Sequence, residues 1–177
     1  MAPLTHQELD DLYEAMMGRM HLELVAALTR ANRTGELEEL LASLGMSDLL
    51  SRDEDPSPFE VGKVIVLGAS QVSIDKLRSI AKKEGFDPDR FEFKTEYKQL
   101  KHFDFGKIRG SMGYVAIFAG PMPHSTPGAE EASSFIARVE NNPDDYPQLF
   151  KLATKNEFKI TNNSFRNALR EFKEQFC

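Results

Sequence analysis

Lys63–Leu67, with the sequence KVIVL, is the stretch that decides the fold. It is a continuous run rich in β-branched residues, and Gly62 and Gly68 bound it on its two sides. Such a run is typical of a strand that is buried on both faces of a parallel sheet, because a half-exposed strand alternates apolar and polar residues instead. The stretch therefore predicts a central parallel strand with helices on both faces of its sheet.

The rest of the C-terminal part alternates between strand and helix patterns. Strands are expected over 91–97, 114–119 and 148–153, with a short extra strand over 157–160, and helices over 73–84, 129–140 and 164–176. The strand over 91–97 alternates and is less apolar, which places it at an edge. Right-handed crossovers then predict a small Rossmann-like three-layer α/β domain whose mostly parallel sheet has the order 2-1-3-4.

The N-terminal part has the pattern of an αα-hairpin. Thr5 and Glu8 stand at capping-box spacing, and apolar residues then recur every three or four positions until about Ala31. A second helix is expected over 37–44, closed by Gly45. The predicted parts are an acidic hairpin over 1–50, a linker over 51–61 and the Rossmann-like domain over 62–177. The apolar stripe of the hairpin either mediates a homodimer or a protein partner, or it packs on the α/β domain.

Charge and composition narrow the classes of function. The 177 residues carry a net charge of −6; residues 1–60 hold 13 acidic and 4 basic residues, and residues 61–177 hold 15 acidic and 18 basic residues. Because binding to duplex DNA needs a concentrated basic face, duplex DNA is not expected as a partner. The only cysteine is Cys177, so no internal disulfide or zinc-thiolate cluster is expected. Without a membrane-spanning run or a secretory signal, a cytoplasmic protein is expected.

The loop after the first strand, 68–73, is the first candidate for a ligand site. In an open parallel sheet, ligands bind beyond the carboxyl ends of the strands. Gly68 permits a tight turn there, and Ser70 and Ser73 stand where a helix begins, which is a place that attracts anions. The G-x-G-x-x-G fingerprint and a P-loop lysine are absent, so neither NAD nor ATP is predicted. The alternative is that the serines only cap the helix.

The loop 120–128, GPMPHSTPG, follows a buried strand and is the second candidate. Its three prolines predict a rigid loop, which either packs as a shaped element or holds His124, Ser125 and Thr126 after Gly120 in a pre-organised site. His124 is the candidate acid or base near neutral pH. A metal site is not expected, because no second ligand stands at a suitable spacing.

The third candidate is the turn before the last helix, where Thr161, Asn163 and Ser164 precede Arg166. An arginine one turn into a helix can reach an anion at the helix start; alternatively, the polar residues cap the helix and the arginine is solvated. Glu96, near the end of the second predicted strand, could bind a ribose hydroxyl. The basic and aromatic stretch 97–110 suits either single-stranded nucleic acid or an amphipathic crossover, and the crossover is favoured.

The segments VIVLGAS, YVAIFAGPMPHS and KITNNSFRNAL together resemble an uncharacterised family of small Rossmann-like domains found in bacteria and their prophages. That family combines a glycine-ended first strand, a GPxPHS loop and a KITxxSFxxAL element, and the resemblance covers about residues 62–172. It implies the fold and a shared pocket at His124, Ser125, Thr161 and Ser164, and it implies no reaction.

These patterns lead to three hypotheses of function. The first is binding or sensing of a nucleotide or another phosphorylated, anionic small ligand at the carboxyl ends of the strands. The second is an enzyme that acts on a nucleotide or a nucleic-acid phosphate, with His124 as acid or base. The third is an interaction or adaptor protein without a ligand. No cofactor other than a nucleotide or phosphate is expected, and no membrane partner.

Overall fold

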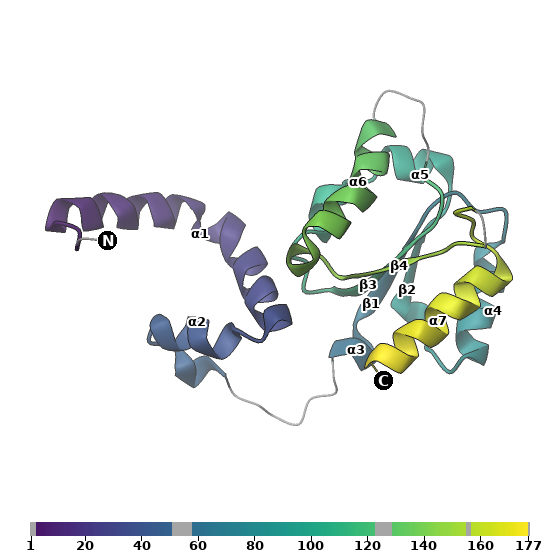
Figure 1. Ribbon diagram of the computed structural model, residues 1–177, viewed down its shortest axis with the longest axis horizontal. Coiled ribbons are helices and arrows are strands. Elements are labelled where there is room, and N and C mark those ends of the chain that lie inside the picture. The colour runs from purple at the N-terminus through teal and green to yellow at the C-terminus, as the bar shows by residue number, and fades with distance from the viewer. Residues whose placement is uncertain (1–2, 51–57, 123–128, 155–156, 177) are drawn as a thin grey trace.

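The computed structural model describes residues 3–50, 58–122, 129–154 and 157–176, with side chains described except at 58 and 129–134. Four strands form one all-parallel sheet in the order β2-β1-β3-β4. The strands are β1 (Lys63–Leu67), β2 (Phe91–Lys94), β3 (Tyr114–Ala119) and β4 (Gln148–Lys151) (Figure 1). The α/β class, the parallel sheet and the strand order predicted from the sequence are confirmed.

Strand β1 lies at the centre of the described sheet, as its apolar run predicts. Ile65 is paired with Glu92 of β2 on one side and with Ile117 of β3 on the other. Val64, Ile65, Val66 and Leu67 have no solvent exposure. The second strand is an edge strand, also as expected.

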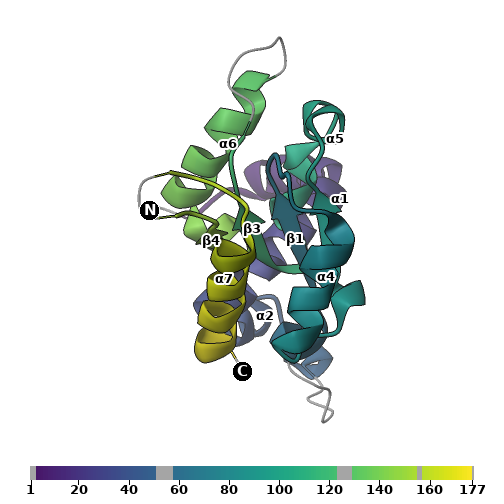
Figure 2. The ribbon, with the colours of Figure 1, turned by 90° about the vertical axis from the view of Figure 1, so that its right-hand side faces the viewer.

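Helices cover both faces of the sheet, which gives three layers (Figure 2). One face is covered by α4 (Ile74–Lys83) and α7 (Asn162–Phe176), and the other by α5 (Tyr97–Lys101), the 3-10 turn η3 (Phe105–Ile108) and α6 (Ala129–Asn141). Val64 and Val66 point into the first core, and Ile65 and Leu67 into the second, because successive side chains of a strand alternate between faces.

The core between the sheet and α7 is built largely of phenylalanine. Phe118 of β3 lies at its centre, with ring centroids between 5.3 and 6.3 Å from four other rings, those of Phe91, Phe150, Phe165 and Phe172. Edge and tilted geometries of this kind add to the hydrophobic burial. The packing fixes α7 on the sheet and so positions the turn at its N-terminus.

The linker expected over 51–61 ends earlier than predicted. Pro58–Val61 form a single helical turn, α3, that belongs to the α/β domain. The Phe59 ring stacks on Phe176 at the end of α7, with ring centroids 4.2 Å apart, and Arg90 donates a hydrogen bond to the Phe59 carbonyl oxygen over 2.6 Å. Arg90 ends the 3-10 turn η2 (Pro88–Arg90) before β2. These non-local contacts are the reason why a proline-rich segment without periodicity still forms a helical turn.

The N-terminal helices are α1 (His6–Thr34) and α2 (Leu37–Ser43), followed by the 3-10 turn η1 (Ser47–Leu49). The predicted capping box is confirmed: the Thr5 N–H donates to the Glu8 carboxylate over 2.8 Å, and the Glu8 N–H donates to the Thr5 hydroxyl over 3.3 Å. Helix α1 continues almost one turn beyond the predicted end at Ala31. It ends at Gly35, whose φ of 80° permits the left-handed cap.

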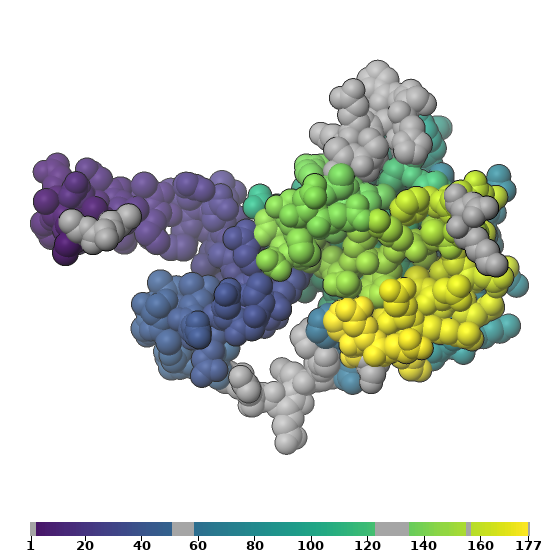
Figure 3. All heavy atoms as spheres, in the orientation of Figure 1, coloured from purple at the N-terminus to yellow at the C-terminus, as the bar shows by residue number. Residues whose placement is uncertain are grey.

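The last turns of α1 pack on the α/β domain. A Cβ at Gly110 would lie 2.6 Å from the Ala26 Cα, so the two backbones are in direct contact. The Thr29 hydroxyl donates to the Gly110 carbonyl oxygen over 2.9 Å. Asp145, at the end of the 3-10 turn η4 (Pro143–Asp145), forms ion pairs with Arg30 of α1 and with Arg109. The end of α1 therefore packs on the domain, as one of the two interpretations of the hairpin expects, and the earlier turns project away from it (Figure 3). The homodimer or partner role of the stripe stays a prediction.

Three of the predicted strands differ in extent from the observed ones. The second strand ends at Lys94 rather than residue 97, and the fourth ends at Lys151 rather than residue 153. No strand forms over 157–160 among the described residues. Instead, Ala153 and Phe158 form one isolated antiparallel bridge, flanked by a 2.9 Å hydrogen bond from the Lys159 N–H to the Leu152 carbonyl oxygen. The described segments before and after residues 155–156 therefore pair antiparallel at this bridge, and the second segment does not extend the parallel sheet. No described helix has both the length and the apolar character needed to cross a membrane.

Candidate functional site

A pocket of about 730 Å³ lies at the carboxyl ends of the parallel strands. Four segments that are distant in sequence contribute to it: the turn after β1, the turn after β2, the end of β3 and the segment that leads into α7. Its lining residues are Ala69, Ser70, Gln71, Val72, Thr95, Glu96, Tyr97, Pro121, Glu157, Phe158, Lys159, Ile160, Thr161 and Asn162. The sequence predicts this location, and the volume lies within the range of small-molecule sites.

Two glycines allow these segments to meet. A Cβ at Gly68 would lie 2.7 Å from the Gly120 carbonyl carbon, and a Cβ at Gly120 would lie 2.4 Å from Cγ1 of Ile160. The Ala69 N–H donates to the Pro121 carbonyl oxygen over 2.8 Å, and the Gly120 N–H donates to the Leu67 carbonyl oxygen over 2.7 Å. Gly68 and Gly120 are therefore needed for the close approach of the strand ends beside the pocket, although neither glycine is among the pocket-lining residues.

The turn between β1 and α4 is held by its own serines. The Ser70 hydroxyl accepts from the Val72 N–H over 3.0 Å and donates to the Val72 carbonyl oxygen over 3.1 Å. The Ser73 hydroxyl caps α4 by accepting from the Lys76 N–H over 3.4 Å, and Ser73 is not among the pocket-lining residues. Both serines thus have the capping and turn roles that were the alternative to ligand binding. Ser70 and Gln71 still line the pocket.

Glu96 and Tyr97 line the pocket from the end of β2. Glu96 precedes the first residue of α5, but its side chain does not cap that helix. Its carboxylate is exposed and is placed to accept hydrogen bonds from a ligand hydroxyl. Tyr97 keeps 45% of its surface exposed and offers an aromatic face at the pocket wall.

The turn before α7 is a reciprocal cap formed by Thr161 and Ser164. The Thr161 N–H donates to the Ser164 hydroxyl over 2.9 Å, and the Ser164 N–H donates to the Thr161 hydroxyl over 3.0 Å. Ser164 is buried, and its hydroxyl also donates to the Lys159 carbonyl oxygen over 2.7 Å. Ser164 therefore has the capping role that is the alternative to ligand binding, and it is not among the pocket-lining residues. Its role as a binding residue stays a prediction.

The same cap leaves backbone donors at the start of α7. Within the described part of the chain, the N–H groups of Asn162 and Asn163 donate no hydrogen bond. Asn162 lines the pocket, while the Asn163 side chain accepts a 3.1 Å hydrogen bond from Arg166. Helix α7 has 15 residues, so its N-terminus carries the partial positive charge of a full helix dipole toward the pocket.

Arg166 is not among the pocket-lining residues, and its contact with a ligand anion stays a prediction. Its guanidinium lies 3.2 Å from the Glu84 carboxylate, and Arg170 binds the same carboxylate over 2.9 Å. The hydrogen bond from Arg170 is the largest cause that lowers the pKa of Glu84. The arginines therefore join α7 to the end of α4, on the side of the helix that faces its neighbour.

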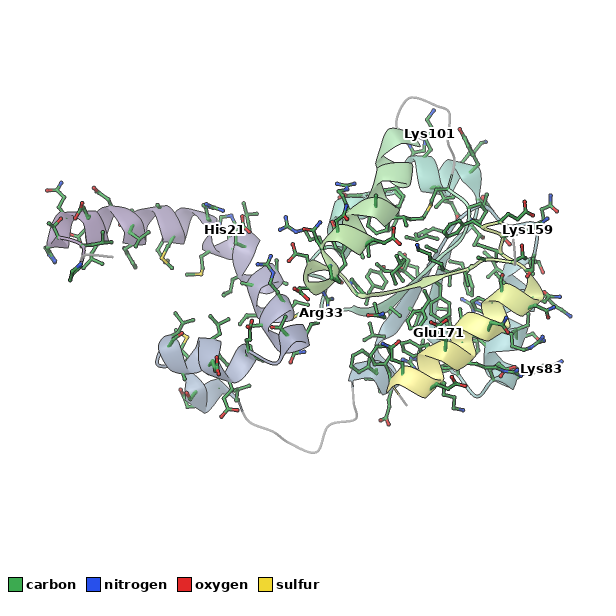
Figure 4. The ribbon with its side chains drawn as sticks, in the orientation of Figure 1. His21, Arg33, Lys83, Lys101, Lys159 and Glu171 are labelled. Carbon is green, nitrogen blue, oxygen red and sulfur yellow. The ribbon has the colours of Figure 1, made fainter. Side chains whose placement is uncertain are left out.

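The segment before α7 supplies pocket residues that the sequence pattern did not single out. Lys159 and Phe158 line the wall, and Figure 4 shows Lys159 near the start of α7. The Lys159 ammonium lies 3.4 Å from the Glu157 carboxylate, and both side chains are more than half exposed. This ion pair is weak enough for Lys159 to rearrange toward a ligand anion. The signal that could have found these residues is their position directly before the Thr161 cap.

The basic and aromatic stretch 97–110 forms the amphipathic crossover that was favoured. The Phe105 ring is buried and lies 4.9 Å from the Phe135 ring, and Phe103 packs on Phe105. Lys98, Lys101 and Lys107 are exposed. The rings of Phe103 and Phe105 therefore serve the core and are not arranged as a platform for bases.

His124, Ser125 and Thr126 lie outside the described residues, so their predicted roles remain predictions. Their loop leaves β3 through Pro121, which lines the pocket, and Met122, which is buried. Among the residues that the structure describes, no group of three or more His, Cys, Asp or Glu side chains could hold a metal ion.

None of the protein-family models, the curated proteins or the solved structures that were compared with this chain matches it. The fold and the pocket therefore carry the functional argument alone.

Proposed function

We propose that the protein binds a small phosphorylated ligand, of nucleotide size, in the pocket at the carboxyl ends of its strands. The observation that carries the proposal is the convergence of four strand-end segments on one pocket at the N-terminus of α7. Helix N-termini bind phosphate through free N–H groups and the helix dipole. Asn162 and Asn163 provide such groups, and Lys159 stands beside them.

The lining residues favour a ligand that also carries hydroxyl groups and a flat apolar part. Glu96 and Glu157 give the pocket two carboxylates against one lysine, so a bare anion gains little from side-chain charge. A carboxylate at the end of the second strand binds sugar hydroxyls in nucleotide-binding folds. Tyr97 and Phe158 are 45% and 41% exposed, and their rings suit a base. A nucleotide combines the three features.

The proposal is for binding, and it assigns no chemical step. His124, the one acid or base that the sequence singles out, belongs to the loop outside the described residues. Turnover of a bound nucleotide that is lost in His124→Ala, with ligand affinity retained, would change the assignment from a sensor to an enzyme.

Thermal unfolding of the full chain tests the proposal. Nucleoside mono-, di- and triphosphates, dinucleotides and inorganic phosphate are added in turn. A ligand at 100 times its Kd stabilises the folded state by about 2.7 kcal/mol, which raises Tm by about 5–10 °C for a chain of this size. The expected result is such a shift with a nucleotide and a smaller one with inorganic phosphate. No shift with any of these ligands would contradict the proposal.

A pair of lysine variants locates the binding. Lys159→Gln removes the pocket lysine, and we expect the Kd of the best nucleotide to rise about tenfold, since a hydrogen bond to a charged group is lost. Lys83→Gln is the matched control, because Lys83 is an exposed lysine at the end of α4, away from the pocket (Figure 4). Equal affinities of the two variants would place the ligand elsewhere.

A further inference from the structure

The first turns of α1 expose an apolar stripe that the fold leaves uncovered among the described residues. Seven large apolar side chains of α1 are between 38% and 59% exposed, and all of them except Val25 form the stripe: Leu9, Leu12, Tyr13, Met16, Met17 and Leu24. Their spacings of three and four residues place them on one side of the helix. Exposed apolar patches of this extent mark interaction sites more often than single exposed residues do.

The packing of α1 on the domain does not use this stripe. The contacts to the domain come from Ala26, Thr29, Arg30 and Arg33, which lie in the last turns. The part before them stands clear of the α/β domain (Figures 1 and 3), and Figure 4 marks His21 on it and Arg33 where α1 meets the domain. Along the stripe, a hollow of about 300 Å³ is lined by Leu12, Ala15, Met16, Arg19, Met20 and Glu23.

Carboxylates border the stripe on both sides. Glu8 stands one turn before Leu12, and Glu23 stands one turn after Met20, on one border. Asp10 and Glu14 stand one turn before Tyr13 and Met17 on the other border. Residues 6–25 contain five acidic residues and one arginine, and this arginine, Arg19, is hydrogen-bonded to Glu23 within the helix over 3.0 Å.

We propose that this face of α1 is a docking site for a basic amphipathic helix of a protein partner. An apolar helix face sits on the stripe, and lysine or arginine side chains at its edges pair with the bordering carboxylates. The three methionines at 16, 17 and 20 adapt to the partner's shape, because methionine is unbranched and flexible. A second copy of α1 fits less well, since each free segment carries a net charge of −4 and like charges repel.

Binding of a synthetic helix by the full chain tests this proposal independently of the pocket. The probe is an 18-residue peptide of leucine and lysine with one tryptophan on its apolar face, about 27 Å long as a helix. The chain has no tryptophan, so the emission reports only the peptide. We expect a blue shift that saturates at one peptide per chain and weakens as salt is added. The matching leucine and glutamate peptide should not bind.

Variants on opposite sides of α1 give the control. Leu12→Gln with Met16→Gln should raise the Kd of the basic peptide at least about tenfold, because two buried apolar contacts are lost. Leu22→Gln should change it less than about twofold, although Leu22 is the more exposed side chain at 73%, because it lies off the stripe. Absence of saturable binding, or an equal loss in both variants, would overturn the proposal. Sedimentation of the chain alone as a dimer that Leu12→Gln with Met16→Gln dissociates would also overturn it, by assigning the stripe to a second copy.

Discussion

Replacing Gly68 by alanine should destabilise the α/β domain more than any conservative surface change. The new Cβ would lie 2.7 Å from the carbonyl carbon and 2.8 Å from the Cα of Gly120, and both are backbone atoms that cannot rotate away. Overpacking of this kind costs about 1–3 kcal/mol. The φ of Gly68 is 130°, which L-residues rarely adopt, and such strain costs about another 1–3 kcal/mol. The free energy of unfolding should therefore fall by about 2–6 kcal/mol.

Urea unfolding followed by circular dichroism at 222 nm measures this effect. With an m-value of about 2 kcal/mol/M, the midpoint should fall by about 1–3 M. Gly18→Ala is the matched control, because Gly18 lies within α1 with no atom within 4 Å of a new Cβ, and alanine should stabilise that helix by about 0.5–1 kcal/mol. A Gly68→Ala midpoint within experimental error of the parent chain would refute the close approach of β1 and β3 on which the pocket depends.

Three further changes test the cap of α7, the anchor of α1 and the edge of the sheet. Ser164→Ala should lower the free energy of unfolding by about 1–3 kcal/mol in the same urea assay, since a buried hydroxyl that is hydrogen-bonded to Thr161 and Lys159 is lost. An unchanged value would contradict the reciprocal cap. Asp145→Ala should lower the free energy of unfolding by about 1 kcal/mol and speed proteolysis at the end of α1. Asp144→Ala, a change at the exposed neighbouring residue, should do neither. The 2.5 Å hydrogen bond that the Tyr114 hydroxyl donates to Glu92 lowers the pKa of that carboxyl group. The bond therefore stabilises the folded state above the unfolded-state pKa of about 4.3, and this stabilisation is lost as the pH falls through the folded-state pKa. In Tyr114→Phe, the free energy of unfolding measured between pH 3 and 7 should fall less steeply toward acid pH, by under about 1 kcal/mol. An unchanged pH profile would exclude this hydrogen bond as the cause of the pH dependence.

The sequence predicts the fold well because the signals for it are local. The KVIVL run, the alternating edge strand and the helical spacings each reflect burial that a single element experiences. The Thr5–Glu8 capping box is local in the same sense, and the structure forms it as predicted. The errors lie at the ends of elements, because contacts with residues distant in the sequence determine where an element begins or ends. An example is the stacking of Phe59 on Phe176, which orders the last part of the predicted linker.

The site is predicted less completely, because side-chain partners are non-local. The sequence places Ser70, Glu96 and Thr161 at strand ends, and the structure brings all three to one pocket. The sequence does not show that Arg166 faces Glu84 at the end of α4, because this contact depends on how the two helices cross. Lys159 was missed for a similar reason: its place at the wall follows from the antiparallel bridge between the described segments before and after residues 155–156.

We propose above that the carboxyl ends of the strands bind a phosphorylated ligand. The most direct test of this proposal is a nuclear magnetic resonance titration of the ¹⁵N-labelled full chain with the nucleotide that raises Tm most. We expect the amide signals of Gln71, Glu96, Asn162 and Asn163 to shift together and to saturate with one Kd, while the signals of the first turns of α1 stay in place. Shifts confined to α1, or no saturable shift at these four amides, would contradict the proposal.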